Sequence, residues 1–148
     1  MDLRERLILE QQILQRDGLT QFQIYSNAAS GGYYVWGECH TNSGNAYTLW
    51  SPIPLHYPYD CPPLYIWKPN PLRGYGGKSI NSYGLSHQMH TLNSGPSGEV
   101  QICHWRSERW HSGITLNKVL IKALIWLEAY EQHLTTGKPI NEFVRTMQ

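Results

Sequence analysis

Apolar residues recur at helical spacing near the start of the chain, separated by charged residues and glutamines. They are Leu3, Leu7, Ile8, Ile13 and Leu14. Because residues three and four apart share one face of a helix, this spacing predicts an amphipathic helix. Asp17 and Gly18 end the pattern, so we predict the helix over residues 3–16.

The next part of the chain alternates between apolar and polar positions and is rich in aromatic and β-branched residues. Such alternation, interrupted by turn-forming residues, predicts strands. We place them at residues 21–25, 33–41, 46–53 and 64–67. Prolines at 52, 54, 58, 62 and 63 remove backbone donors, so they end the third strand and rigidify the approach to the fourth.

Helical periodicity returns near the C-terminus. A strongly apolar pattern predicts a long helix over about residues 116–134, with Thr115 as its N-cap. Gly137 and Pro139 stop this helix, and a short final helix is expected over residues 140–147. Between strands and helix, residues 68–99 are rich in Gly, Pro, Asn and Ser, which indicates a long loop folded over a functional face.

This element order predicts the α+β class. Strands that follow one another with short turns form an antiparallel meander, here of four strands, with one face packed on the helices. No repeat or linker interrupts the pattern, so the 148 residues are expected to form a single domain.

Composition narrows the function. The chain is 41% hydrophobic and 16% charged with a net charge of +1, and no basic run is present, which argues against a nucleic-acid partner. The charged N-terminal residues do not resemble a secretory signal, and no apolar run is long enough to span a membrane. We therefore expect a cytoplasmic protein without a membrane partner.

The chemistry is expected at a cysteine. Cys39, Cys61 and Cys103 are odd in number and widely spaced, which does not indicate a disulfide framework. Cys103 stands between the Gly-rich loop and the long helix, with His104 beside it. A thiolate is the nucleophilic form of cysteine, and a nearby imidazole can generate or stabilise it. A buried structural cysteine is the alternative reading.

Four short motifs around Cys103 extend this argument. They are the run from Gly98 to Cys103, Trp110, the run from Ile114 to Leu120, and the pairs Tyr57-Pro58 and Pro62-Pro63. Their order resembles that of ubiquitin-conjugating enzymes over about residues 33–127, including the five-residue offset from Trp110 to Thr115. The resemblance implies the UBC-like fold, with an N-terminal helix, the four-stranded meander, a long active-site loop and C-terminal helices.

The divergence from eukaryotic members is similar to that of bacterial ubiquitin-conjugating-like proteins from CBASS antiphage defence operons. The resemblance implies a thioester-forming acyltransferase that carries a protein C-terminus on Cys103 and transfers it to an amine. The expected partner is a CD-NTase (a cGAS-like nucleotidyltransferase) or a ubiquitin-like protein, with an activating enzyme as a further candidate. No cofactor or metal is expected.

One departure concerns the oxyanion donor. The family has His-Pro-Asn about ten residues before its cysteine, whereas this chain has His90-Thr91-Leu92-Asn93 thirteen residues before Cys103. His90 matches the family histidine, but Asn93 can replace the asparagine only if the loop folds differently. Acyl transfer needs a deprotonated nucleophile and donors aimed at the oxyanion, and we assign these roles to His104 and His90, with His87 behind them.

Three alternatives remain open. His87, His90, Cys103 and His104 are residue types that bind zinc, although their spacing matches no common zinc module. A non-catalytic binding module of the same fold is the second alternative. A cysteine protease is the third, but no distant Asn or Asp partner is evident. The six tryptophans are expected in core and sheet packing, with Trp105 and Trp110 as rim residues near Cys103.

Overall fold

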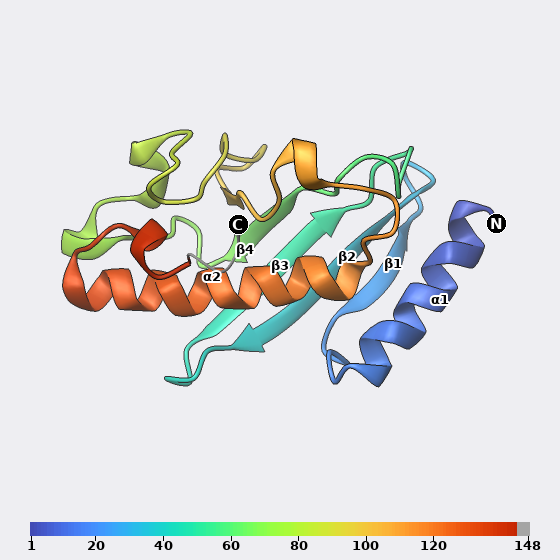
Figure 1. Ribbon diagram of the computed structural model, residues 1–148, viewed down its shortest axis with the longest axis horizontal. Coiled ribbons are helices and arrows are strands. Elements are labelled where there is room, and N and C mark those ends of the chain that lie inside the picture. The colour runs from blue at the N-terminus through green and yellow to red at the C-terminus, as the bar shows by residue number, and fades with distance from the viewer. Residues whose placement is uncertain (145–148) are drawn as a thin grey trace.

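The computed structural model describes residues 1–144 (Figure 1). The regular elements are α1 (Leu3–Arg16), β1 (Gln23–Asn27), β2 (Gly32–His40), β3 (Ala46–Pro52), β4 (Leu64–Lys68), β5 (Val100–Ile102) and α2 (Leu116–Thr136). Short 3-10 turns occupy Tyr75–Gly77, Ile80–Tyr83, Ser107–Arg109 and Ile140–Glu142. The predicted α+β class is confirmed: two α-helices accompany one antiparallel sheet.

The sheet has five strands in the order β1-β2-β3-β4-β5, so each strand lies beside its neighbour in the sequence. The four predicted strands are all present, but the prediction of four was wrong by one. The additional strand β5 pairs antiparallel with β4, through Leu64 opposite Ile102 and Ile66 opposite Val100. Three residues are too few to show an alternating pattern, which explains why no strand was predicted over residues 100–102.

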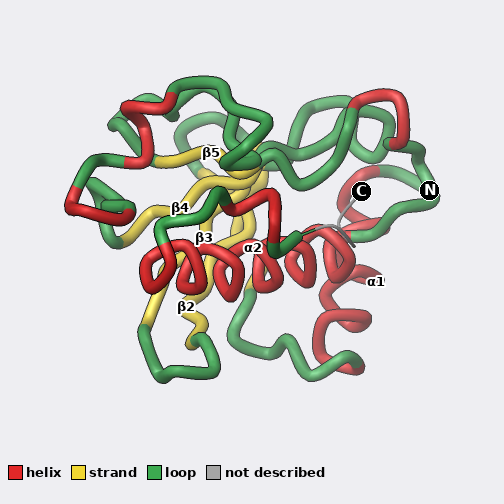
Figure 2. Tube along the Cα trace, turned by 60° about the vertical axis from the view of Figure 1, so that its left-hand side comes forward, coloured by secondary structure: helices red, strands yellow, loops and turns green. Residues whose placement is uncertain are grey.

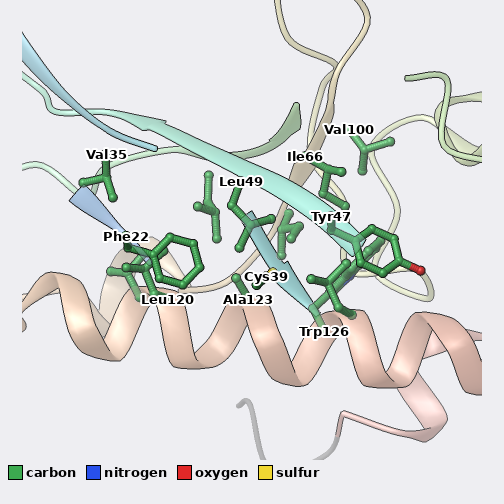
Figure 3. Packing of buried hydrophobic residues seen from close by; sticks show 14 of the residues in the cluster. Phe22, Val35, Cys39, Tyr47, Leu49, Ile66, Val100, Leu120, Ala123 and Trp126 are labelled. Carbon is green, nitrogen blue, oxygen red and sulfur yellow. The ribbon is translucent and has the colours of Figure 1, made fainter. Parts of the chain in front are cut away.

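Helix α2 crosses one face of the sheet and buries the core beneath it (Figures 1 and 3). In Figure 3, Val35 of β2 points toward Phe22, and Leu49 of β3 points toward Ala123 of α2, with Trp126 farther along the helix. All five are fully or almost fully buried. Truncating such a side chain, as in Leu49→Ala, costs about 2–5 kcal/mol because it removes apolar contacts and leaves a cavity.

The tryptophans divide between the two faces of the sheet. Trp126 belongs to the core, as expected, and is completely buried. Trp36, Trp50 and Trp67 are only partly buried, and they occupy alternate strand positions to the core residues Val35, Leu49 and Ile66. Since successive side chains of a strand point to opposite faces, these three indoles lie on the face away from α2.

The start of α2 is stabilised from outside the helix. Thr115 occupies the predicted N-cap position, but its hydroxyl donates to the Asn117 side chain and does not cap the helix. The Glu10 carboxylate of α1 accepts the Leu116 N–H instead, at 2.7 Å. At the other end, Gly137 adopts the left-handed conformation with φ 75°. The helix therefore ends at Thr136, two residues beyond the prediction.

The remaining predicted elements differ in detail. Residues 68–99 form the expected long connection, which runs beside β4 and β5 (Figure 2) and contains two of the 3-10 turns. Its ends are held together by the Asn70 side chain, which donates to the Ser97 carbonyl at 2.9 Å. The predicted final helix over 140–147 begins as the turn Ile140–Glu142, and residues 145–147 lie outside the described part of the chain.

Within residues 1–144, neither α-helix has the length and apolar character needed to cross a bilayer.

Candidate active site

Cys103 directly follows β5, the edge strand of the sheet. Its backbone N–H donates to the His90 carbonyl at 2.8 Å, so the long loop holds the residue at the point where the strand ends. An isolated bridge between Thr91 and Ile102 fixes the same two segments next to each other. Cys103 is partly exposed, whereas Cys39 is buried in the core. Cys61 is partly exposed as well, so burial argues only against Cys39 as the thiol that meets a macromolecular substrate.

The surroundings of Cys103 act on its pKa in opposite directions. Partial burial raises the pKa of the thiol, and the nearby Glu108 carboxylate adds to this effect. Arg106 and Lys122 favour the thiolate and lower the pKa, but burial is the larger influence. The free thiol is therefore mainly protonated at neutral pH. An incoming acyl donor has to remove that proton or deliver a base for it.

His104 is adjacent to Cys103 in sequence but bonded elsewhere. It is buried, and its Nδ1 lies 3.2 Å from the Ile102 carbonyl oxygen. Because a carbonyl accepts only, Nδ1 carries the proton and Nε2 is the free acceptor. Nε2 lies 3.6 Å from Sγ of Cys61, and the same thiol lies 3.7 Å from the Pro62 carbonyl oxygen. Burial lowers the pKa of His104 to about 4, so the imidazole is neutral.

His90 contacts Cys103 through its backbone. The residue is buried and has a positive φ of 51°, which is uncommon outside glycine. Its Nε2 donates to Oδ1 of Asn141 at 2.7 Å, and burial lowers the pKa of the imidazole. His87 is exposed, with its ring 5.5 Å from that of His90. The His90 side chain is thus anchored by the C-terminal segment, while its backbone carbonyl contacts Cys103.

Asn93 does not take part in the contacts of Cys103. Its side chain is exposed, and Leu92 beside it pairs through its backbone N–H with the Gln101 carbonyl at 2.9 Å. The asparagine that contacts the site histidine is Asn141, which lies far away in sequence. Asn141 stands in the C-terminal segment, which the sequence motifs around Cys103 do not include, so no local signal pointed to it.

Lys122 is a second residue that sequence reasoning missed. It projects from α2 and is half-buried, and its Nζ lies 3.5 Å from the centre of the Trp105 ring. Burial lowers the pKa of this amine, and the neighbouring charge of Arg109 acts in the same direction. Trp105 in turn packs edge-on against Trp110, at 6.1 Å between rings. A lysine that stands directly beside an apolar position, Ala123, in the predicted helix is the sequence signal that could have identified it.

The zinc alternative would require His87, His90 and Cys103 to converge on one point. His90 instead directs Nε2 to the amide of Asn141. Within residues 1–144, no three His, Cys, Asp or Glu side chains are grouped as metal ligands would be. The geometry of the described residues therefore offers no support for that alternative.

Two motifs that are distant in sequence meet beside the site. The indole N–H of Trp110 donates to the Pro58 carbonyl at 2.9 Å, and the rings of Tyr57 and Trp110 lie 6.4 Å apart. The Tyr57-Pro58 pair thus holds the segment that leads from Cys103 to α2.

A comparison of the sequence with models of known protein families finds no match, and a search of curated proteins finds no relative.

Proposed function

We propose that the chain has a UBC-like fold and acts as a ubiquitin-conjugating-like enzyme, with Cys103 as the acyl carrier. The observation that carries the proposal is the placement of a partly exposed thiol at the end of an edge strand, held through its backbone by the His90 carbonyl. The meeting of Trp110 with Tyr57 and Pro58 supports it, because these residues belong to the motifs that gave the resemblance.

The proposed reaction has two steps. In the first, Sγ of Cys103 attacks the carbonyl carbon of a protein C-terminus that an activating enzyme holds as a thioester. The bond from this carbonyl to the activating enzyme's sulfur breaks, the Cys103 thiol proton goes to that leaving thiolate or to solvent, and the thioester on Cys103 forms. In the second, an amine attacks the thioester carbonyl, Sγ leaves and takes up a proton, and an amide forms. Sulfur is suited to this role because a thioester is more reactive toward amines than an oxygen ester.

The site residues contribute unequally to these steps. Arg106 and Lys122 favour negative charge on sulfur, which helps Cys103 as attacking and as leaving group. His90 orients Cys103 through its carbonyl, and Asn141 fixes His90. His104 is neutral and bonded to Cys61, so we propose that it supports the fold of the site next to the reacting sulfur.

The proposed acyl donor is the C-terminus of a CD-NTase or of a ubiquitin-like protein, in antiphage defence in the cytoplasm. This part of the proposal rests on the resemblance of the motifs around Cys103, since the site itself does not distinguish between protein C-termini.

The test is adduct formation in a purified system. The protein is incubated with ATP, an activating enzyme and each candidate donor, and the products are separated with and without reductant. We expect an adduct on Cys103 that a thiol reductant removes, an adduct resistant to reductant in Cys103→Ser, and none in Cys103→Ala. Cys61→Ala is the matched control and should retain the adduct. Persistence of the reductant-sensitive adduct in Cys103→Ala would refute the proposal.

A further inference from the structure

The face of the sheet away from α2 carries a cluster of aromatic rings. Trp67 lies 5.1 Å from Trp36 and 5.5 Å from Trp50, measured between ring centres. Tyr25 stacks on Tyr34 at 5.4 Å. Both α-helices contribute buried residues to the core on the other side of the sheet, so neither of them covers these rings. An aromatic surface of this kind that faces solvent indicates a binding site.

These rings line an open groove of about 700 Å³. One wall comes from β1 and the turn after it, and the opposite wall is the segment Pro96, Ser97 and Glu99 of the long loop. None of the residues that surround Cys103 lines this groove. The groove is therefore separate from the candidate active site, and its open shape suits an extended chain better than an enclosed small molecule.

Glu99 places a carboxylate in the wall of this groove. The residue is 2% exposed, and Oε1 accepts the Ser97 N–H at 2.6 Å. No Lys, Arg or His within residues 1–144 forms an ion pair with it. A buried carboxylate without a counter-charge is costly, so a cation that enters the groove would gain a strong electrostatic interaction.

The tryptophans also have unused hydrogen-bonding capacity. In the described part of the chain, the indole N–H groups of Trp36, Trp50 and Trp67 donate to no protein acceptor. None of these three indole nitrogens is both buried and unpaired. Within residues 1–144, that description applies to the indole nitrogen of Trp105 alone. The three N–H groups can thus donate to the carbonyl oxygens of a peptide. Trp50 stacks on Tyr65 at 5.2 Å, whereas Trp36 and Trp67 meet their neighbours tilted or edge-on, so these two rings offer faces to a cation.

We propose that this groove binds an extended, arginine-bearing segment of a partner protein, with a guanidinium stacked on the tryptophan rings and paired with the Glu99 carboxylate. Arginine fits both features, because its planar guanidinium stacks on aromatic faces and pairs with carboxylates in a fork. The indole donors meet the peptide backbone. The proposal goes beyond the acyl-carrier function and does not depend on it.

The test uses a short blocked peptide of alternating glycine and arginine, titrated into the ¹⁵N-labelled protein. The indole N–H signals of Trp36, Trp50 and Trp67 should shift, and the signal of the core residue Trp126 should not. The same peptide with citrulline, which is neutral and similar in shape, should bind about 10-fold more weakly, the loss expected for one cation–π contact and one charged hydrogen bond.

The decisive variant is Glu99→Gln, which preserves side-chain shape and removes the charge. We expect about 10-fold weaker binding of the arginine peptide. Glu38→Gln is the matched control, because Glu38 is an exposed carboxylate on the same sheet face but outside the groove. It should bind as the wild type does. Thermal unfolding of each variant checks that the fold is intact.

Several results would overturn the proposal. Equal binding of the arginine and citrulline peptides would assign the face to apolar docking without charge recognition. Unchanged affinity in Glu99→Gln would remove the role of the carboxylate. Absence of indole shifts at millimolar peptide, or self-association of the protein through this face in sedimentation experiments, would exclude the basic segment as the occupant. Cys103→Ala should bind the peptide normally whether or not the thioester is found.

Discussion

The Glu10 carboxylate joins three parts of the fold, and its removal gives the largest single effect on stability that we predict. Glu10 lies in α1 and is 1% exposed. Its carboxylate accepts hydrogen bonds from Nε of Arg6 at 2.6 Å and from the backbone N–H of Leu116 at 2.7 Å. The Tyr57 hydroxyl lies 2.6 and 2.8 Å from its two oxygens. One side chain thus connects α1, the segment before β4 and the first turn of α2.

The magnitude follows from what Glu10→Ala leaves behind. The Tyr57 hydroxyl stays buried without its acceptor, the Leu116 N–H loses its cap, and the partly buried Arg6 loses its counter-charge. Breaking a buried charged network from one side costs about 3–5 kcal/mol. Most natural domains are stable by only about 5–15 kcal/mol, so this loss brings the chain close to unfolding. Glu10→Gln keeps the shape, and we expect about 1–3 kcal/mol.

The assay is urea denaturation followed by tryptophan fluorescence, with the free energy of unfolding extrapolated to water. Glu5→Ala is the control, because Glu5 is an exposed carboxylate in the same helix. We expect it to change stability by less than about 1 kcal/mol. If Glu10→Ala were as mild as Glu5→Ala, the carboxylate would not connect these elements and the reasoning would be wrong.

Two further predictions concern pH. Since burial lowers the pKa of His104 from 6.5 to about 4, the unfolded chain takes up a proton below pH 6.5 that the folded chain refuses, and stability should fall by about 3 kcal/mol from pH 6.5 to pH 4. Urea unfolding across this range should show a smaller dependence in His104→Gln, and an equal one would contradict the assignment. Because Lys122 lowers the pKa of Cys103, Lys122→Met should raise it and slow alkylation of Cys103 by iodoacetamide at pH 8 roughly 3-fold, as followed by peptide mass spectrometry. Lys118→Met, at an exposed position of the same helix, should leave the rate unchanged.

The elements with a long local pattern were predictable from the sequence. Helix α1 has the predicted bounds because its apolar face repeats over several turns and Asp17 follows it. The strand β5 was not predictable in this way. Its three residues become a strand because β4 offers them a pairing edge, and β4 is separated from them by the whole long loop. Pairing between distant segments leaves no trace in a local pattern.

The candidate site likewise has features that the local sequence predicts and features that depend on the tertiary fold. Cys103 could be proposed as the acyl carrier from the sequence because the motifs around it are local in sequence. The contacts of the neighbouring side chains could not be predicted in this way. His104 looked suited to act on Cys103, yet its Nε2 faces Cys61, a residue from the segment before β4. Lys122 and Asn141 reach the site from α2 and from the C-terminal segment, and only the tertiary fold brings them there.

The agreement between strand order and chain order has a consequence for biosynthesis. Each strand finds its partner in the strand made just before it, so hairpins can form successively as the chain leaves the ribosome. The thiol is attached to the last of these strands, and its neighbour Lys122 is translated later still. We therefore expect a nascent chain to present a largely formed sheet while its cysteine still lacks the positive charge that α2 contributes through Lys122.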